Sequence, residues 1–211
     1  MMALTISVFS DVICPWCFLG KRRLEHALDQ LGLRETTTVE WLAFELNPDI
    51  PAEGIERSVY RARKFGAERS AELDMQMTEL GSREGINFAF ACMRRTPSTR
   101  KAHMLIAAAG QQGSGDALME ALFRAYFENG RDVGGEAILL DVADEVGLDR
   151  QVALAALKSA ELRSLVLSVE AQAAEMQVSG VPFFIVDHQW AVSGAQSAEQ
   201  WVTLIRQQQN A

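Results

Sequence analysis

The chain has 211 residues, of which 48% are hydrophobic and 23% are charged, so it can bury a sizeable core in one enlarged domain or in a domain that carries an insert. Its formal net charge of −8 argues against nucleic acid or an anionic membrane as a partner. No run of about 18 hydrophobic residues predicts a transmembrane helix, and the first residues lack the basic segment of a signal peptide. Three cysteines do not make a structural disulfide framework, and we therefore expect a cytoplasmic protein.

The first elements in chain order are a strand, a helix and a second strand. Residues 4–8 alternate between hydrophobic and polar side chains, which predicts a strand. Hydrophobic residues recur at helical spacing over 18–31, and Gly32 suits the end of that helix. Residues 37–44 are rich in β-branched and aromatic side chains, which predicts the second strand.

Two cysteines stand at the start of the predicted helix, in the sequence Cys14-Pro15-Trp16-Cys17. Thiols at this spacing can close a small disulfide ring, and the backbone N–H groups of a helix N-terminus stabilise a thiolate at the first of them. Because the thiolate performs disulfide exchange, the motif predicts a redox centre in which Cys14 attacks and the more buried Cys17 resolves. Pro15 suits the first helical turn, and Trp16 offers an exposed aromatic surface to a substrate.

A zinc half-site or a pair of inert core thiols is the alternative interpretation of this motif. A zinc site needs two further ligands. The remaining cysteine, Cys92, and the three histidines show no ligand spacing, so we expect no metal site. Cys92 itself lies among hydrophobic neighbours and is expected to be buried and inert.

A long helical region follows the second strand. Prolines and a glycine in residues 47–54 predict a loop, and helix-forming residues then dominate to about residue 180. The segment 85–92 is ambiguous and is either extended or a buried loop. The predicted helices are 56–65, 68–81, 98–111, 115–129, 135–146, 149–157 and 160–177. The methionines and aromatic residues of this region either fill the space between helices or line a cleft over the dithiol.

The strand signal returns near the C-terminus. Residues 181–186 form a short hydrophobic run, and residues 190–193 form its partner across a turn. A capping box at Ser197 then begins the last helix. The order of elements predicts an α/β protein, a thioredoxin fold interrupted by an inserted all-helical domain. The expected divisions are 1–46, 47–170 and 171–211.

The dipeptide Val181-Pro182 precedes the first of these C-terminal strands. In a thioredoxin-like fold a proline at this point faces the dithiol through a cis peptide bond, and the preceding backbone is free to pair with an extended substrate. An ordinary turn before a strand is the alternative. The dithiol at the other end of the chain favours the cis-proline interpretation.

The segments DVICPWCFLGKRRLE, FELNP, KAHMLIAA, ALFRAYF, GVPFFIVD and AVSGAQ together resemble the DsbA superfamily, specifically its FrnE-like branch. 2-Hydroxychromene-2-carboxylate isomerases and kappa-class glutathione transferases are related to it. The resemblance covers nearly the whole chain and implies a cis Val181-Pro182 bond, with Cys14 as the attacking thiol and Cys17 as its partner. The related isomerases and transferases usually have serine where Cys14 stands, and Ala195-Gln196 replaces the pair with which kappa-class enzymes hold glutathione.

Further polar residues near the motif have two possible roles each. Asp11 either tunes the dithiol and shuttles its protons or holds a turn. His103 either lines the groove that faces Cys14 or is a structural histidine. The basic residues 21–23 either stabilise the thiolate or form a solvated helix face, which is the expected role.

The predicted function is thiol–disulfide exchange on a protein or a small thiol substrate. We expect no cofactor other than the redox-active disulfide, with glutathione as a candidate co-substrate. One alternative is a glutathione-dependent isomerase or transferase of an aromatic or polyketide-like compound. Another is a redox-sensing, chaperone-like module whose hydrophobic helical surface holds client proteins. A homodimer is compatible with the sequence, whereas nucleic acid and membrane partners are not expected.

Overall fold

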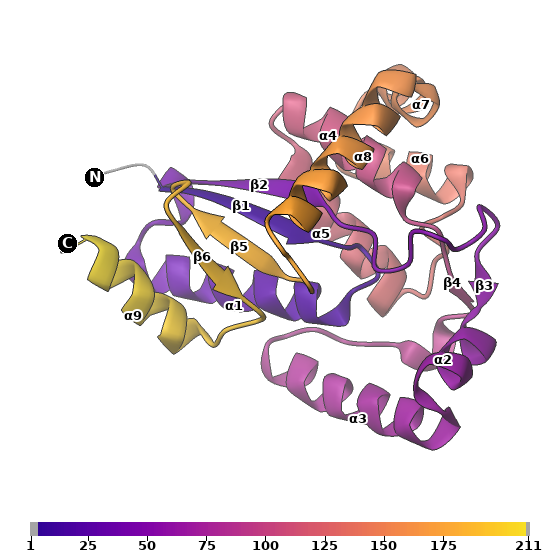
Figure 1. Cartoon of the computed structure of the whole chain (residues 1–211), viewed down its shortest axis with the longest axis horizontal. Coiled ribbons are helices and arrows are strands. Elements are labelled where there is room, and N and C mark those ends of the chain that lie inside the picture. Colours follow the sequence, from indigo (N-terminus) through magenta and orange to yellow (C-terminus); the bar gives the residue numbers. More distant parts are fainter. Residues whose placement is uncertain (1–3, 210–211) are drawn as a thin grey trace.

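The computed structural model describes residues 4–209. Four strands in that range form one sheet: β1 (Leu4–Ser10), β2 (Thr37–Ala43), β5 (Phe183–Val186) and β6 (Trp190–Ser193). Their order across the sheet is β2-β1-β5-β6 (Figure 1). β1 runs parallel to β2 and antiparallel to β5, which pairs antiparallel with β6. The sheet therefore joins both ends of the chain, and the predicted α/β class is confirmed.

One face of this sheet packs against α1 (Pro15–Leu31) and α9 (Ala198–Gln209), which lie side by side (Figure 1). Ile6 and Val8 of β1 point to this face, where Trp201 of α9 is fully buried. Side chains alternate along a strand, so Phe9 points to the opposite face. There it packs with Ala173 of α8 (Ala160–Glu175). Helices thus cover both faces of the sheet.

Between β2 and β5 the chain is mainly helical. The helices before α8 are α2 (Arg57–Phe65), α3 (Ala67–Arg83), α4 (Arg100–Gln111), α5 (Gly115–Phe123), α6 (Glu136–Glu145) and α7 (Arg150–Lys158). Their bounds confirm the predicted ranges to within two residues, except that a π-helical turn, Arg124–Glu128, follows α5. No helix among the described residues has the length and hydrophobicity needed to cross a bilayer.

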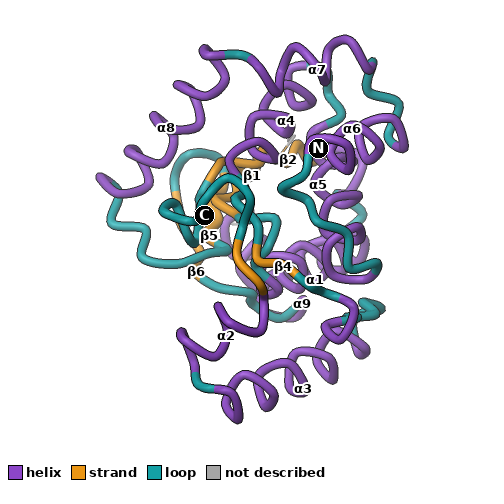
Figure 2. Tube along the Cα trace, turned by 90° about the vertical axis from the view of Figure 1, so that its right-hand side faces the viewer, coloured by secondary structure: helices purple, strands orange, loops and turns teal. Residues whose placement is uncertain are grey.

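The helices α2 and α3 stand apart from the bundle of α4, α5, α6 and α7 (Figure 2). A two-stranded ribbon of β3 (Ile55–Glu56) and β4 (Arg95–Thr96) holds the two ends of the α2–α3 segment together. The ambiguous segment 85–92 is a loop that ends in a 3-10 turn, Phe90–Cys92. Strands of two residues carry no periodicity, which is why the sequence did not indicate this ribbon.

Phe18 of α1 connects the sheet to the helical region. Its ring stacks on Phe123 of α5, with 5.0 Å between ring centroids, and on Phe127, with 6.1 Å between them. It meets the Phe88 ring edge-on at 6.0 Å. These residues belong to one continuous buried cluster that also contains Cys17. The division into separate domains at residues 47 and 170 stays a prediction, because this cluster runs from α1 into the helices of the insert.

Lys21 corrects the expectation of a solvated face over residues 21–23. Its side chain is buried, and its ammonium pairs with Glu25 and lies 3.2 Å from Glu120 and 3.5 Å from Asp116. Burial alone would lower the pKa of Lys21, but these three carboxylates raise it. The expectation failed because α5 packs across this part of α1 and supplies two of the carboxylates.

Candidate active site

The first cysteine of the motif lies at the point where the sheet gives way to α1. β1 ends at Ser10, a short turn follows, and Cys14 is the residue that precedes the first helical residue, Pro15. The Cys14 amide donates to the Asp11 carbonyl at 2.9 Å, and the Cys17 amide donates to the Cys14 carbonyl at 3.0 Å. Pro15 has no N–H to lose at this position. The Cys14 sulfur is therefore held at the positive end of the α1 dipole.

The two thiols of the motif have different surroundings. Both cysteines are free; Cys14 is 4% exposed, whereas Cys17 is 0% exposed and Trp16 between them is 45% exposed. Burial, together with the hydrogen bond to Cys14 and its charge, raises the pKa of Cys17 well above its ordinary value. The neighbouring Ser10 side chain and Asp11 backbone oppose this rise in the pKa of Cys17 only in part. The sequence correctly predicted the more buried thiol and the exposed indole.

The Val181-Pro182 bond is cis, as predicted. The Val181 carbonyl accepts a hydrogen bond from the Cys14 thiol, with 3.6 Å between sulfur and oxygen. Gly20 permits this arrangement on the other side of the loop, since a Cβ atom at that position would stand 3.0 Å from Pro182 Cγ and 3.4 Å from the Phe184 ring. The dithiol and the proline loop, from opposite ends of the chain, therefore form one site.

A cavity of about 400 Å³ opens beside Cys14. Pro15, Trp16 and Val181 line it on the side of the dithiol. The opposite wall comes from α2, α3, the Phe90–Cys92 turn and the π-helical turn, and its hydrophobic residues are Phe65, Leu73, Met77, Leu80, Phe90, Met93 and Phe127. The hydrophobic residues of the helical region thus serve both expected roles, because several of them fill the core and also bound this cavity.

Three cations from α2 line the same cavity: Arg57, Arg61 and Lys64. Arg57 forms a bidentate pair with Asp74 at 2.8 and 2.9 Å, and Arg61 reaches the same carboxylate at 2.8 Å. The Lys64 ammonium donates to the Tyr60 hydroxyl at 2.7 Å but makes no ion pair within the described residues. One carboxylate therefore balances three positive charges, which leaves this wall electropositive.

Asp11 and His103, both singled out from the sequence, lie together. The Nε2 atom of His103 is 3.6 Å from Oδ1 of Asp11, and the other carboxylate oxygen accepts the Leu46 amide at 2.7 Å. His103 is absent from the lining of the cavity beside Cys14. It lines a second cavity instead, of about 600 Å³, along the free edge of β2. The alternative in which His103 faces the Cys14 groove is therefore incorrect.

Sequence reasoning missed a second buried acid next to this pair, Glu45. Arg100 donates to its carboxylate at 2.6 Å, and the Glu45 amide donates to the Glu170 carboxylate at 3.0 Å. Burial and the charge of Glu170, opposed by Arg100, raise the pKa of Glu45 to about 7. Asp11, Glu45 and His103 come from three separate segments of the chain. The only local sign that Glu45 is buried was its position within a hydrophobic stretch.

The remaining cysteine, Cys92, corrects another expectation. It was expected to be buried, but it lies exposed on the Phe90–Cys92 turn. The hydrophobic neighbours that suggested burial, Phe90 and Met93, point into the cavity beside Cys14 instead. Within residues 4–209, no group of three or more histidine, cysteine, aspartate and glutamate side chains is arranged to hold a metal ion.

Residues 5–206 match the family model described as the DSBA-like thioredoxin domain. The chain belongs to this DsbA-like thioredoxin family. In the same family of folds, SCO1869 of Streptomyces coelicolor, described as a probable DsbA oxidoreductase, is 30% identical to it. The two structures align with a TM-score of 0.87 over 97% of this chain and 89% of the other.

Two solved structures share the DsbA-like fold at lower sequence identity. The cytosolic disulfide reductase DsbM of Pseudomonas aeruginosa, solved with GSH, is 17% identical, with a TM-score of 0.66 over 98% of this chain and 100% of DsbM. A 2-hydroxychromene-2-carboxylate isomerase is 16% identical, with a TM-score of 0.71 over 98% of this chain and 95% of the isomerase. Both similarities show the fold alone. The predicted thioredoxin fold and the superfamily are confirmed.

Proposed function

We propose that this DsbA-like protein is a thiol–disulfide oxidoreductase in which Cys14 attacks and Cys17 resolves. One observation carries the proposal: the Cys14 sulfur lies at the N-terminus of α1, on the wall of the 400 Å³ cavity and 3.6 Å from the Val181 carbonyl. The helix terminus stabilises a thiolate at Cys14. The raised pKa of Cys17 keeps the second sulfur protonated until it is needed.

The reaction begins when the Cys14 thiolate attacks one sulfur of a substrate disulfide. The substrate S–S bond breaks, one substrate thiolate leaves, and Cys14 carries the other half as a mixed disulfide. Cys17 then loses its proton and attacks the Cys14 sulfur, which closes the Cys14–Cys17 disulfide and releases the second substrate thiolate. Two electrons pass from the dithiol to the substrate, and the reverse sequence oxidises a substrate dithiol. The Val181 backbone offers the bound substrate an edge for pairing.

The cavity supports a small acidic disulfide as substrate, such as a mixed disulfide of glutathione. Its volume of about 400 Å³ falls within the range of small-molecule sites. The α2 wall is electropositive, and Lys64 is the cation without a carboxylate partner in the described part of the chain. Cys14 is nearly buried, which favours a small substrate over a folded protein. We propose no cofactor besides the dithiol, and a cytoplasmic location where the glutathione pool exchanges with it.

Single-cysteine substitutions test this function. With glutathione disulfide as substrate, Cys14→Ser and Cys17→Ser should each abolish turnover. Cys17→Ser should in addition accumulate one glutathione per chain, measured by intact mass, because its mixed disulfide at Cys14 is not resolved. Cys92→Ser is the matched control, since Cys92 is exposed outside the cavity, and it should retain full turnover. Turnover that survives Cys14→Ser would refute the proposal.

The hydrophobic wall of the cavity supports one second candidate, a glutathione-dependent isomerase of an aromatic compound. That chemistry needs a glutathione site but no disulfide cycle. Full isomerase activity in Cys14→Ser, without disulfide exchange in the unaltered protein, would establish it. Client binding that survives the double change of both motif cysteines would instead favour the chaperone-like alternative.

A further inference from the structure

β2 lies at one edge of the four-stranded sheet, so one side of its backbone has no strand partner (Figure 1). The Phe44 amide, just after β2, donates to the Ser10 carbonyl of β1 at 3.2 Å, and backbone groups alternate in direction along a strand. The amides and carbonyls of Val39 and Trp41 therefore point away from β1. Neither residue has a backbone partner outside the sheet among residues 4–209. An edge of this kind can pair with another extended chain.

The cavity of about 600 Å³ follows this edge over its whole length, because all seven residues of β2 line it. Helices α4 and α8 supply the hydrophobic part of its lining, which consists of Ile106, Leu165, Val166 and Val169. Small residues at the end of α4 keep the space open, since a Cβ atom at Gly110 or Gly113 would meet no atom within 4 Å. This side of the edge therefore has room for hydrophobic side chains.

A smaller cavity of about 230 Å³ lies on the other face of the same strand, against Leu24 and Leu28 of α1. The residues that line both cavities are Thr37, Val39, Trp41 and Asp116. Successive side chains of a strand point to opposite faces of a sheet. A strand added at the free edge of β2 would therefore direct alternate side chains into the two cavities.

The smaller cavity is lined by charged residues. Its paired charges are Lys21, Glu25, Arg34 and Asp116. Glu35, in the same lining, is exposed and forms no ion pair within the described part of the chain. Glu40, in the lining of the larger cavity, is likewise exposed and has no cationic partner there. These two free carboxylates, in a chain with a formal net charge of −8, favour a basic partner.

We propose that the free edge of β2 binds an extended peptide segment of a partner protein as an additional strand. Its hydrophobic side chains would enter the cavity beside α4 and α8, and its basic side chains would enter the cavity beside α1. In this mode of recognition, main-chain hydrogen bonds provide affinity and the pockets for alternate side chains provide specificity. None of the residues that line these two cavities lines the cavity beside Cys14. The surface is therefore separate from the dithiol, and the inference goes beyond the proposed disulfide exchange.

A short synthetic peptide tests this interface. The probe is an acetylated and amidated peptide of alternating valine and lysine, about six residues long, which is a typical strand length. Titration into the isotope-labelled protein, followed by NMR, should show saturable binding with shifts of the Val39 and Trp41 amides. A fully N-methylated copy, which cannot donate main-chain hydrogen bonds, should bind about tenfold more weakly or worse. A copy with glutamate in place of lysine should also bind more weakly.

Leu165→Ala should weaken binding of the valine–lysine peptide several-fold. Leu167→Ala is the matched control and should bind normally, because both leucines lie on α8 and are 43% exposed, but only Leu165 lines the cavity. Glu35→Gln should weaken binding as well, whereas Glu199→Gln, at an exposed position of α9, should not.

Three results would overturn the proposal. The first is the absence of saturable binding at millimolar peptide, or equal affinity for the N-methylated copy. The second is loss of binding when Cys14 and Cys17 are both changed to serine, which would place the peptide at the dithiol instead. The third is a dimer that pairs through β2 and is not dispersed by the peptide, which would assign this edge to a second copy of the chain.

Discussion

Gly20 and Pro182 are in direct contact, and the contact leaves no room for a side chain on the glycine. A Cβ atom at position 20 would stand 3.0 Å from Pro182 Cγ, closer than most carbon contacts allow. Gly20 belongs to α1, which carries the dithiol, and Pro182 belongs to the loop whose Val181 carbonyl meets Cys14. The spacing between α1 and the loop therefore sets the distance between the Cys14 sulfur and the Val181 backbone.

Gly20→Ala should push α1 away from the proline loop. We expect a loss of about 1–3 kcal/mol in the free energy of unfolding, as for other overpacked sites, and slower disulfide exchange. Urea unfolding and turnover of glutathione disulfide measure the two effects. Gly110→Ala is the control, because Gly110 lies in α4 with open space around it, and alanine there should stabilise the helix slightly. Equal behaviour of the two variants would contradict this account of the contact.

Lys21→Ala should be strongly destabilising. It would leave the carboxylates of Glu25, Glu120 and Asp116 without their buried cation, and removing one partner of a buried ion pair costs about 3–5 kcal/mol. Arg22, which also pairs with Glu25 and Glu120, will reduce that cost. Thermal unfolding provides the measurement, with the exposed Lys158→Ala as control. A change in Tm no larger than that of the control would show that the cluster does not hold α5 against α1.

Glu45 should make the folded protein less stable as the pH rises toward neutrality. Its pKa is raised from 4.5 to about 7 in the folded protein, so between these values the native state holds a proton that the unfolded chain has released. Stability from this group is therefore lost as the pH rises from 4.5 to 7. Glu45→Gln should flatten the fall in Tm over this interval.

The control for that measurement is Glu53→Gln, at an exposed loop position, which should follow the unaltered protein throughout. If Glu45→Gln shows the same dependence of Tm on pH as the unaltered chain, Glu45 is charged at neutral pH. The assignment of a protonated carboxyl beside Arg100 would then be wrong.

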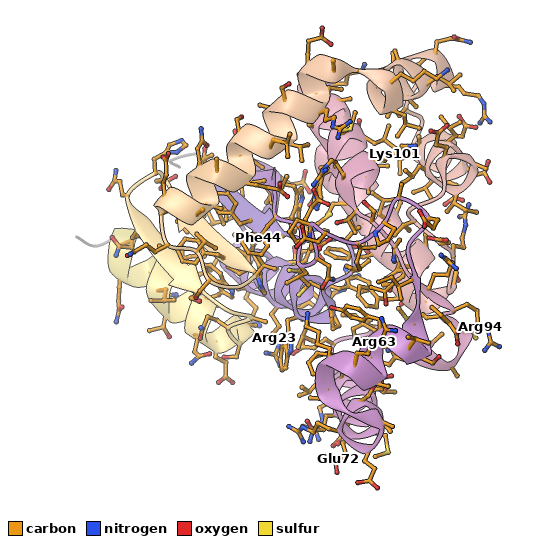
Figure 3. All side chains as sticks on the ribbon, turned by 45° about the vertical axis from the view of Figure 1, so that its right-hand side comes forward. Arg23, Phe44, Arg63, Glu72, Arg94 and Lys101 are labelled. Carbon is orange, nitrogen blue, oxygen red and sulfur yellow. The ribbon has the colours of Figure 1, made fainter. Side chains whose placement is uncertain are left out.

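Lys64→Gln should change substrate preference more than catalysis. Removal of the unpaired ammonium should lower kcat/KM for glutathione disulfide several-fold, by about 0.5–1 kcal/mol of ion pairing at a partly exposed site. A neutral disulfide of similar size should be little affected. Arg63→Gln is the matched control, since Arg63 lies on the same helix (Figure 3) and is not among the residues that line the cavity. Equal losses for both substrates would remove the argument for an acidic substrate.

Local patterns in the sequence predicted most elements of the fold. Period-two alternation indicated β1, helical spacing indicated the helices of the insert, and Cys14-Pro15-Trp16-Cys17 marked the start of α1. Each of these patterns involves residues only a few positions apart, so it can be recognised in the sequence without knowledge of the tertiary structure. The cis bond between Val181 and Pro182 was predicted from a proline before a C-terminal strand together with the dithiol motif, and the family resemblance implied it too; the structure bears it out.

The composition of the site could not be predicted in the same way, because its parts meet only through folding. Asp11 and His103 were named separately, but nothing in the sequence pairs them, and Glu45 was overlooked. The local patterns also failed to predict burial. Lys21 was expected to be solvated and Cys92 to be buried, and both expectations are wrong. Helices that are distant in the sequence decide which side chains are exposed.

Phe18, the residue that follows Cys17, has its ring against Phe88, Phe123 and Phe127 from the helical region. A chimera that replaces this helical region with that of a relative would need aromatic side chains in the new region that pack against Phe18. A poor fit would rotate the first turn of α1 and carry both sulfur atoms with it. The helical region and the Cys14–Cys17 pair are thus constrained to change together, and grafting a new helical region onto this scaffold begins with that aromatic cluster.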